Sequence, residues 1–144
     1  MTRHLPQLEP RWQAGQEVRW RLGSWERDWL LDKGSLTKRL IKASHGDFRV
    51  KIQRQTMSSV YNSEAQLLGI PLQQQALVRE VILVGAGKPW VFARSVIPHS
   101  TLTGRLRSLS KLDSRPLGAL LFQDPKMERG GIEVAQIKSG DRFL

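Results

Sequence analysis

The sequence predicts an α+β fold, in which short helices pack on an antiparallel sheet. The strongest observation is residues 76–97 (ALVREVILVGAGKPWVFARSVI), where two β-rich runs flank a four-residue loop with two glycines at 85–88. Helix-type start signals precede several other short segments. Hairpins interrupted by short helices are typical of an α+β domain and not of a doubly wound parallel sheet.

The first part of the chain predicts little regular structure. Residues 1–23 are polar and irregular, which indicates a loose N-terminal arm with a short helix. Ser24 can cap a helix over residues 25–31. Trp25 and Trp29 are four residues apart and so share one helix face, where we expect them to anchor the core.

A first hairpin is predicted next. Residues 36–43 (LTKRLIKA) are interpreted as a strand, residues 45–47 as a turn, and residues 48–52 as a second strand that alternates apolar and basic side chains. One face of this hairpin would be buried and the other basic. Ser63 and Gln66 match a capping box ahead of a short helix.

The remaining elements follow the central hairpin. Both faces of its first strand are apolar, which predicts cover on both sides. Residues 101–112 and 115–122 are predicted to be helical, with Ser114 as the cap of the second helix, and residues 131–137 are a further strand candidate. The length of 144 residues favours one domain over residues 1–144.

Composition excludes several classes of protein. Hydrophobic residues make up 40%, which is too many for a disordered chain, and the absence of Cys removes disulfides, thiolate nucleophiles and Cys-based metal sites. No apolar run approaches the roughly 18 residues of a membrane span. The start, MTRHLPQLEP, lacks the apolar stretch of a signal peptide, so we expect a cytoplasmic protein. We also expect a monomer.

The net charge of +10, from 23 Lys and Arg against 13 Asp and Glu, predicts an anionic partner. Nucleic acid is disfavoured because the basic residues are scattered singly, and neither an RNA-binding signature nor zinc-finger spacing is present. A field that attracts a small dianion fits the charge equally well.

Two familiar kinds of site are absent from the sequence. The histidines, His4, His45 and His99, lie far apart without ligand spacing, so no metal site is predicted. The loop Gly85–Lys88 is too short for a phosphate-binding loop and is followed by Pro89 and a strand, so it is interpreted as a turn.

Arg79 is the residue that most needs an explanation. Its neighbours on the same strand face are Leu77, Val81 and Leu83, and an Arg among apolar residues is costly to bury without an anion. It could pair with an internal carboxylate, or clamp the carboxylate of a ligand through its forked guanidinium. For Arg94, which has similar apolar surroundings, we favour a structural role.

Several blocks resemble the chorismate pyruvate-lyase family. They are Asp28-Trp29-Leu30-Leu31 with Gly34-Ser35-Leu36-Thr37-Lys38-Arg39-Leu40, Val78-Arg79-Glu80-Val81, Gly87-Lys88-Pro89-Trp90 through Ala93-Arg94-Ser95-Val96, and Pro116-Leu117-Gly118 with Leu121-Phe122. Each block alone is weak, but four in the family's order and spacing over about residues 25–135 are specific.

The resemblance implies a fold, an activity and a set of residues. The fold is an antiparallel sheet of about six strands with helices packed on it and helical flaps over a buried ligand site. The activity is conversion of chorismate into 4-hydroxybenzoate and pyruvate, the first step of ubiquinone biosynthesis, without a cofactor or metal. Arg79 is then the catalytic residue and binds the substrate carboxylate. Leu36 and Leu117 bind the two ends of the ligand through their backbones.

The sequence departs from the family pattern near its C-terminal end. The family's later segment WGRRS and a strand with a Glu that faces the product hydroxyl have no match, so we expect the usual C-terminal strand to be missing. Glu133 is a substitute by residue type, although an ordinary strand residue is the preferred interpretation. Two alternatives to the lyase are therefore kept: a non-catalytic ligand-binding domain of the same fold, and a basic nucleic-acid-binding protein.

Overall fold

The computed structural model describes residues 10–103 and 107–137. The chain divides into two compact units, one of residues 35–125 and one that combines the residues before Ser35 with those after Pro125. Each unit is described by itself, and a single domain over residues 1–144 stays a prediction. No helix of the described ranges is long and apolar enough to cross a membrane.

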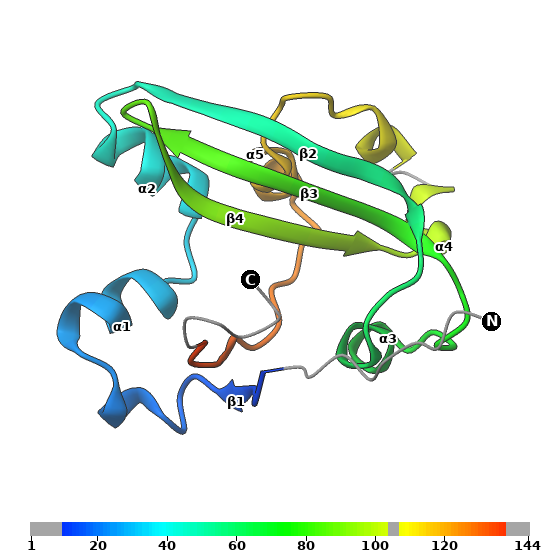
Figure 1. Ribbon diagram of the computed structural model, residues 1–144, viewed down its shortest axis with the longest axis horizontal. Coiled ribbons are helices and arrows are strands. Elements are labelled where there is room, and N and C mark those ends of the chain that lie inside the picture. Colours follow the sequence, from blue (N-terminus) through cyan, green and yellow to red (C-terminus); the bar gives the residue numbers. More distant parts are fainter. Residues whose placement is uncertain (1–9, 104–106, 138–144) are drawn as a thin grey trace. The chain divides into compact units, whose positions relative to one another are not determined.

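The larger unit is built on a three-stranded antiparallel sheet (Figure 1). Its strands are β2 (Phe48–Ser58), β3 (Ala76–Gly85) and β4 (Lys88–Ile97), in the order β2-β3-β4. The predicted central hairpin is confirmed as β3 and β4. Its turn is shorter than the expected loop, because only Ala86 and Gly87 lie outside the strands, with φ angles of 52° and 75°. Positive φ at both turn residues is the type I′ geometry that matches the twist of a hairpin.

A β-bulge divides β2 into two parts. Ile52 pairs with Val81 and Arg54 pairs with Glu80, so Gln53 is an extra residue without a partner in the ladder. Before the bulge the even-numbered residues of β2 share the face of Arg79, and after it the odd-numbered ones do. The bulge therefore brings Gln55 directly opposite Arg79.

The prediction of a strand over residues 36–43 was wrong, because this segment is the helix α2 (Leu36–Ala43). The Ser35 side chain caps it by accepting a hydrogen bond from the Lys38 backbone N–H at 3.2 Å. Its buried residues are Thr37 and Leu40, three positions apart, which is a helical spacing. The second strand of the predicted hairpin exists as the start of β2, but it pairs with β3.

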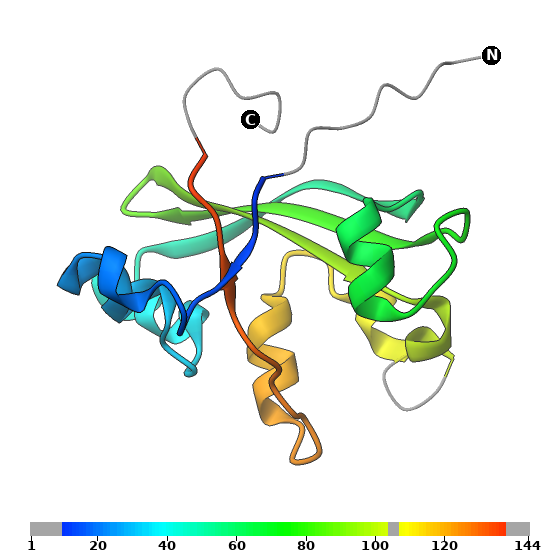
Figure 2. The ribbon, with the colours of Figure 1, turned by 90° about the horizontal axis from the view of Figure 1, so that it is seen from below.

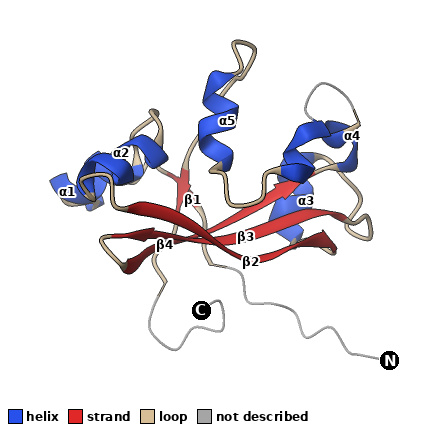
Figure 3. Ribbon diagram, turned by 90° about the horizontal axis from the view of Figure 1, so that it is seen from above, coloured by secondary structure: helices blue, strands red, loops and turns tan. Residues whose placement is uncertain are grey.

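One face of the sheet carries the main apolar cluster, formed by Leu77, Ile97, Leu109 and Leu112. The covering elements are α4 (His99–Leu102), η2 (Arg107–Lys111) and α5 (Leu117–Gln123), and Figures 2 and 3 show α4 and α5 on the same side of the sheet. Helix α5 confirms the helix predicted over residues 115–122. The segment predicted over residues 101–112 contains the end of α4 and the 3₁₀ helix η2, and its residues 104–106 lie outside the described range. The cap of α5 is Pro116 and not Ser114.

The opposite face is covered at one end by α3 (Asn62–Leu68), where Val60, Ala65 and Ala76 pack together. The helix is predicted correctly, but not its start signal. Glu64, three residues after the N-cap Tyr61, accepts a hydrogen bond from the Tyr61 backbone N–H at 2.9 Å, whereas the capping box was expected at Ser63 and Gln66. Apolar residues of both faces of β3 are buried, as expected.

The smaller unit contains β1 (Gln13–Ala14), the 3₁₀ turn η1 (Arg19–Arg21), α1 (Ser24–Leu30) and β5 (Glu133–Val134). Strands β1 and β5 pair antiparallel, so the strand predicted over residues 131–137 contributes only two residues. The arm predicted over residues 1–23 carries β1 and η1 in its described part, and residues 1–9 lie outside the described range. Helix α1 confirms the helix predicted over residues 25–31, but its N-cap is Gly23 and not Ser24 as expected.

The two tryptophans of α1 lie close together without forming a core. Their ring centroids are 6.3 Å apart, but Trp25 is 72% exposed. The expectation that both anchor the core was therefore wrong for Trp25. With helices and antiparallel strands in both units, the α+β class is confirmed. The described residues form sheets of three and two strands instead of the single six-stranded sheet that the resemblance implies.

Candidate functional site

Arg79 lies in the middle of β3 and is 2% exposed. It shares its sheet face with Leu77 and Val81, both of which are buried, and this is the face that η2 and α5 cover. A guanidinium stays charged in proteins, so the fold holds a buried cation on this face. Burial of an unpaired charge is costly, and a site of this kind is an indication of function.

Two neutral oxygens accept hydrogen bonds from the Arg79 guanidinium. Nη1 donates to the Gln55 Oε1 atom at 2.7 Å, and Nη2 donates to the Arg115 backbone carbonyl at 2.9 Å. The Nε atom is buried and has no hydrogen-bond partner among the described residues. Leaving such a donor unsatisfied costs about 1–3 kcal/mol, so a ligand oxygen at this atom would be stabilising.

No ion pair to Arg79 is present in the described part of the chain. Burial lowers the pKa of the Arg79 guanidinium, and the field of Asp113 offsets part of that effect. Of the two explanations given by the sequence, an internal ion pair is thus absent from the described residues. The buried positive charge has no contacting counter-ion there, which favours a site for an anion.

The segment that begins α5 connects the other two predicted site residues. Leu117 is the first residue of α5. It lies two positions after Arg115, whose backbone carbonyl accepts the hydrogen bond from Arg79. Leu36 is the first residue of α2 and is 39% exposed. The neighbouring residues Thr37 and Gly118 approach closely, since a Cβ atom added to Gly118 would lie 3.4 Å from the Thr37 Oγ1 atom. Leu36 and Leu117 thus start two helices that pack together, and no contact joins Leu36 to Arg79 directly in the described structure.

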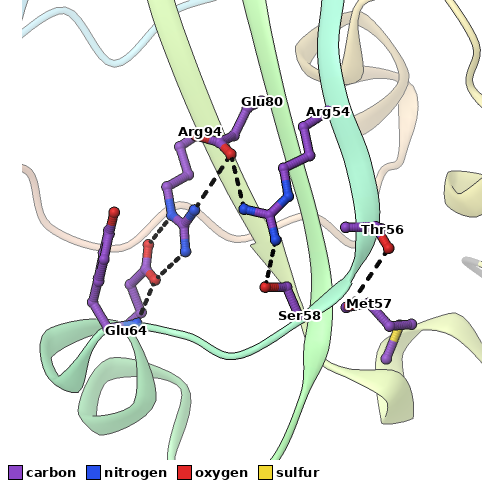
Figure 4. Close-up of polar contacts among 8 residues, drawn as sticks. Arg54, Thr56, Met57, Ser58, Glu64, Glu80 and Arg94 are labelled. Carbon is purple, nitrogen blue, oxygen red and sulfur yellow. Dashed lines mark hydrogen bonds and ion pairs between the residues drawn. The ribbon is translucent and has the colours of Figure 1, made fainter. Parts of the chain in front are cut away.

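Arg94 points to the other face of the sheet and belongs to an ion-pair network (Figure 4). Its Nε and Nη2 atoms donate to the two carboxylate oxygens of Glu64 at 2.8 and 2.9 Å, and its Nη1 atom lies 3.8 Å from Glu80. Its guanidinium carbon lies 4.4 Å from the Tyr61 ring centroid, and Arg54 reaches Glu80 at 3.5 Å. The hydrogen bond to Glu64 raises the pKa of Arg94. These contacts agree with the structural role that we favour for this residue.

Glu133, the substitute by residue type for the family's C-terminal Glu, is an exposed residue of β5. This agrees with its interpretation as an ordinary strand residue. Residues 10–103 and 107–137 contain no group of three His, Asp or Glu side chains placed to hold a metal ion.

Sequence reasoning missed two of the groups that surround Arg79. The Gln55 side chain lies beyond the predicted end of its strand, and only recognition of the bulge at Gln53 could have placed it opposite Arg79. The Arg115 carbonyl is a backbone group, for which the sequence carries no signal.

The fold and this site define an α+β protein with a buried cation between a sheet and its covering helices, and this cation has no ion-pair partner among the described residues. The comparisons with known proteins identify the family. The chorismate lyase family model matches residues 9–144, so the chain belongs to the chorismate lyase family.

Curated relatives named "Probable chorismate pyruvate-lyase" agree with this assignment. The Pseudomonas putida protein is 42% identical over 125 residues, which cover 87% of this chain and 69% of that protein. The Pseudomonas aeruginosa protein is 46% identical over 76% of this chain and 61% of its own length, and the Marinobacter nauticus protein is 42% identical over 78% and 60%. The chain thus spans about 60 to 70% of the length of these relatives.

Proposed function

We propose that the protein is a chorismate pyruvate-lyase that forms 4-hydroxybenzoate and pyruvate from chorismate. The observation that carries the proposal is the buried Arg79 guanidinium, with two neutral acceptors and a free Nε–H in the described structure. It is supported by membership of the chorismate lyase family and by the names of the relatives.

The reaction needs binding and electrostatic help more than covalent chemistry. The ether bond between the ring and the enolpyruvyl group breaks, and the ring carbon that bears the hydroxyl loses its proton. The enolpyruvyl methylene gains a proton, so the products are an aromatic ring and pyruvate. Aromatisation makes the reaction strongly favourable. The protein must therefore hold the side chain against the ring and stabilise the negative charge that develops on the leaving group.

Arg79 has the properties that this task requires. A planar guanidinium pairs with a planar carboxylate through two parallel hydrogen bonds, and these are stronger where water is excluded. We assign the substrate carboxylate to Arg79 and to the backbone of Leu36 at the start of α2, and the hydroxyl end of the substrate to the backbone of Leu117 at the start of α5. The net charge of +10 would attract the dianionic substrate from solution. The monomeric state, the cytoplasmic location and the place in ubiquinone biosynthesis remain predictions from the sequence and the resemblance.

The test is a turnover assay that follows both products. Chorismate is incubated with the wild-type chain, and 4-hydroxybenzoate and pyruvate are expected in equal amounts. The variant Arg79→Lys should lose at least about 90% of kcat/KM, because an ammonium cannot make the forked contact. Arg49→Lys is the matched control, since Arg49 is an exposed residue of the adjacent strand β2.

Each outcome has a distinct meaning. Equal activity in the two variants would remove Arg79 from the site. Binding of 4-hydroxybenzoate without turnover of chorismate in the wild type would overturn the lyase in favour of a non-catalytic ligand-binding domain.

A further inference from the structure

Gln55 is bound at both ends of its side-chain amide. Its Oε1 atom accepts from Arg79 Nη1 at 2.7 Å, and its Nε2 atom donates to the Ser110 backbone carbonyl at 2.9 Å. It lies on the edge strand β2, directly opposite Arg79 in the ladder. A glutamine that is bonded at both ends has one orientation of its amide, because the oxygen can only accept and the nitrogen can only donate.

These bonds form part of a closed circuit around Arg79. The Gln55 side chain accepts from Arg79 Nη1, and the Arg115 carbonyl accepts from Arg79 Nη2. Gln55 also donates to the carbonyl of Ser110, which lies five residues before Arg115, and this bond closes the circuit. The segment between Ser110 and Arg115 is itself anchored by Leu112, which is 1% exposed. Two bonds to a planar group fix the plane of that group. The circuit therefore determines the direction of the other N–H groups, including the Nε–H, which has no partner among the described residues.

The charge of the groups that bind Arg79 affects the site as much as their position does. The two acceptors of Arg79 in the described part of the chain are neutral, so they orient the guanidinium without neutralising it. A carboxylate at position 55 would place a negative charge at the same 2.7 Å position and compete with an incoming anion. A neutral amide leaves the full positive charge available to a ligand.

We propose that Gln55 is a positioning residue that orients Arg79 while keeping it unpaired, and so sets the affinity of the site for the substrate carboxylate. This inference rests on the proposed function, because it takes the Arg79 site to be the carboxylate site of the lyase. Gln55 acts through Arg79 and has no reacting atom of its own.

The experiment compares Gln55→Leu, Gln55→Glu and a matched control. Leu has nearly the volume of Gln but makes no hydrogen bonds, and Glu keeps an acceptor for Arg79 while adding a negative charge. The control is Gln53→Leu, an exposed residue of the same strand at the bulge. Three quantities are measured: the Kd for 4-hydroxybenzoate by calorimetry, kcat and KM for chorismate, and the Arg79 side-chain ¹⁵N resonances.

Gln55→Leu should raise the Kd by about 2-fold to 10-fold, because a guanidinium that Gln55 no longer holds must be ordered when the ligand binds. The order of the variants separates positioning from a merely structural role. If Gln55 only supports the fold, Glu should raise the Kd no more than Leu does, because both lose the bond to Ser110 and Glu retains the bond to Arg79. If Gln55 keeps Arg79 unpaired, Glu raises the Kd more than Leu does, although it still holds the guanidinium.

The NMR measurement needs no substrate. It distinguishes a failure of the role proposed for Gln55 from a failure of the proposed lyase function. In the wild type the Arg79 Nη resonances should be distinct, because the bond to Gln55 slows rotation of the guanidinium, and in Gln55→Leu they should merge. Merged resonances in the wild type, or a Gln55→Leu variant that binds 4-hydroxybenzoate as well as Gln53→Leu, would overturn the role of Gln55. A wild-type chain that shows distinct resonances but neither binds 4-hydroxybenzoate nor turns over chorismate would instead overturn the proposed function, and with it the affinity role of Gln55.

Discussion

The ion pair between Arg94 and Glu64 should be a main source of stability of the larger unit. We predict that Arg94→Met destabilises the protein by about 3 kcal/mol, the lower end of the range for breaking a buried pair. This destabilisation follows from the geometry of the pair. Two hydrogen bonds of 2.8 and 2.9 Å join Arg94 to Glu64, and the two side chains are 15% and 20% exposed. Each charge-assisted bond contributes about 1.5–3 kcal/mol, and the residual exposure to water reduces the sum. For a chain of this length the loss corresponds to roughly 10 °C in Tm.

A double-mutant cycle measures the pair itself. Urea unfolding of the wild type, Glu64→Gln, Arg94→Met and the double variant should give a coupling energy of about 2 kcal/mol. Arg54→Met is the control, because Arg54 reaches Glu80 at only 3.5 Å with a side chain that is 46% exposed, and it should cost less than about 1 kcal/mol. A coupling energy below about 0.5 kcal/mol for Glu64 and Arg94 would refute the argument, since it would give this pair the strength of an ordinary surface contact.

Four further outcomes are expected. Gly85→Ala should destabilise the protein by about 1–3 kcal/mol in urea unfolding, because the added Cβ would overlap the Trp90 indole. Gly130→Ala is the control and should be neutral, since no atom lies near its Cβ position, and equal effects of the two variants would contradict the prediction. Ala86→Asn should raise stability by about 0.5–1 kcal/mol in the same assay, since Ala86 is left-handed at φ 52° in a type I′ turn; a loss would argue against that turn. Calorimetry should show tighter binding of 4-hydroxybenzoate than of benzoate or phenol, and equal affinities would argue against a site that recognises both ends of the ring. If the net charge of +10 attracts the substrate, raising the salt concentration from about 50 to 500 mM should lower kcat/KM more than kcat. A kcat/KM that does not change with salt would show that the charge has no role in attracting the substrate.

The sequence predicted the elements that have a strong local signal. The hairpin of β3 and β4 combines β-rich runs with a glycine turn, and its place in the sheet is as expected. Arg79 was recognised as unusual because its neighbours on the strand are apolar, and its burial confirms that argument. What it contacts could not be predicted, since one partner is a backbone carbonyl and the other is a side chain on another strand.

The helix α2 shows why a short segment can be misinterpreted. Residues 36–43 mix apolar and basic side chains in a way that fits a half-buried strand. The burial of Thr37 and Leu40, three positions apart, and the cap at Ser35 are the helical signals that decide the structure. In eight residues a period of two and a period of 3.6 differ by only a few positions, so the cap at Ser35 and packing against α5 favour the helix where the pattern alone does not decide.

The bulge at Gln53 also limits which changes in chain length the site can tolerate. The even-numbered positions of β2 share the face of Arg79 before the bulge, and the odd-numbered positions do so after it. The bulge therefore shifts by one residue which side chains of β2 face the site. Removal of Gln53 would let Arg54 follow Ile52 directly and still pair with Glu80, so every later partner would be kept. Removal of Arg54 would have the same result, because Gln53 would then pair with Glu80 and Gln55 would stay opposite Arg79. A second deletion in this part of β2 would have no bulge to absorb it and would turn Gln55 away from Arg79. Natural length variation in this strand is therefore expected to be confined to one residue, at the bulge.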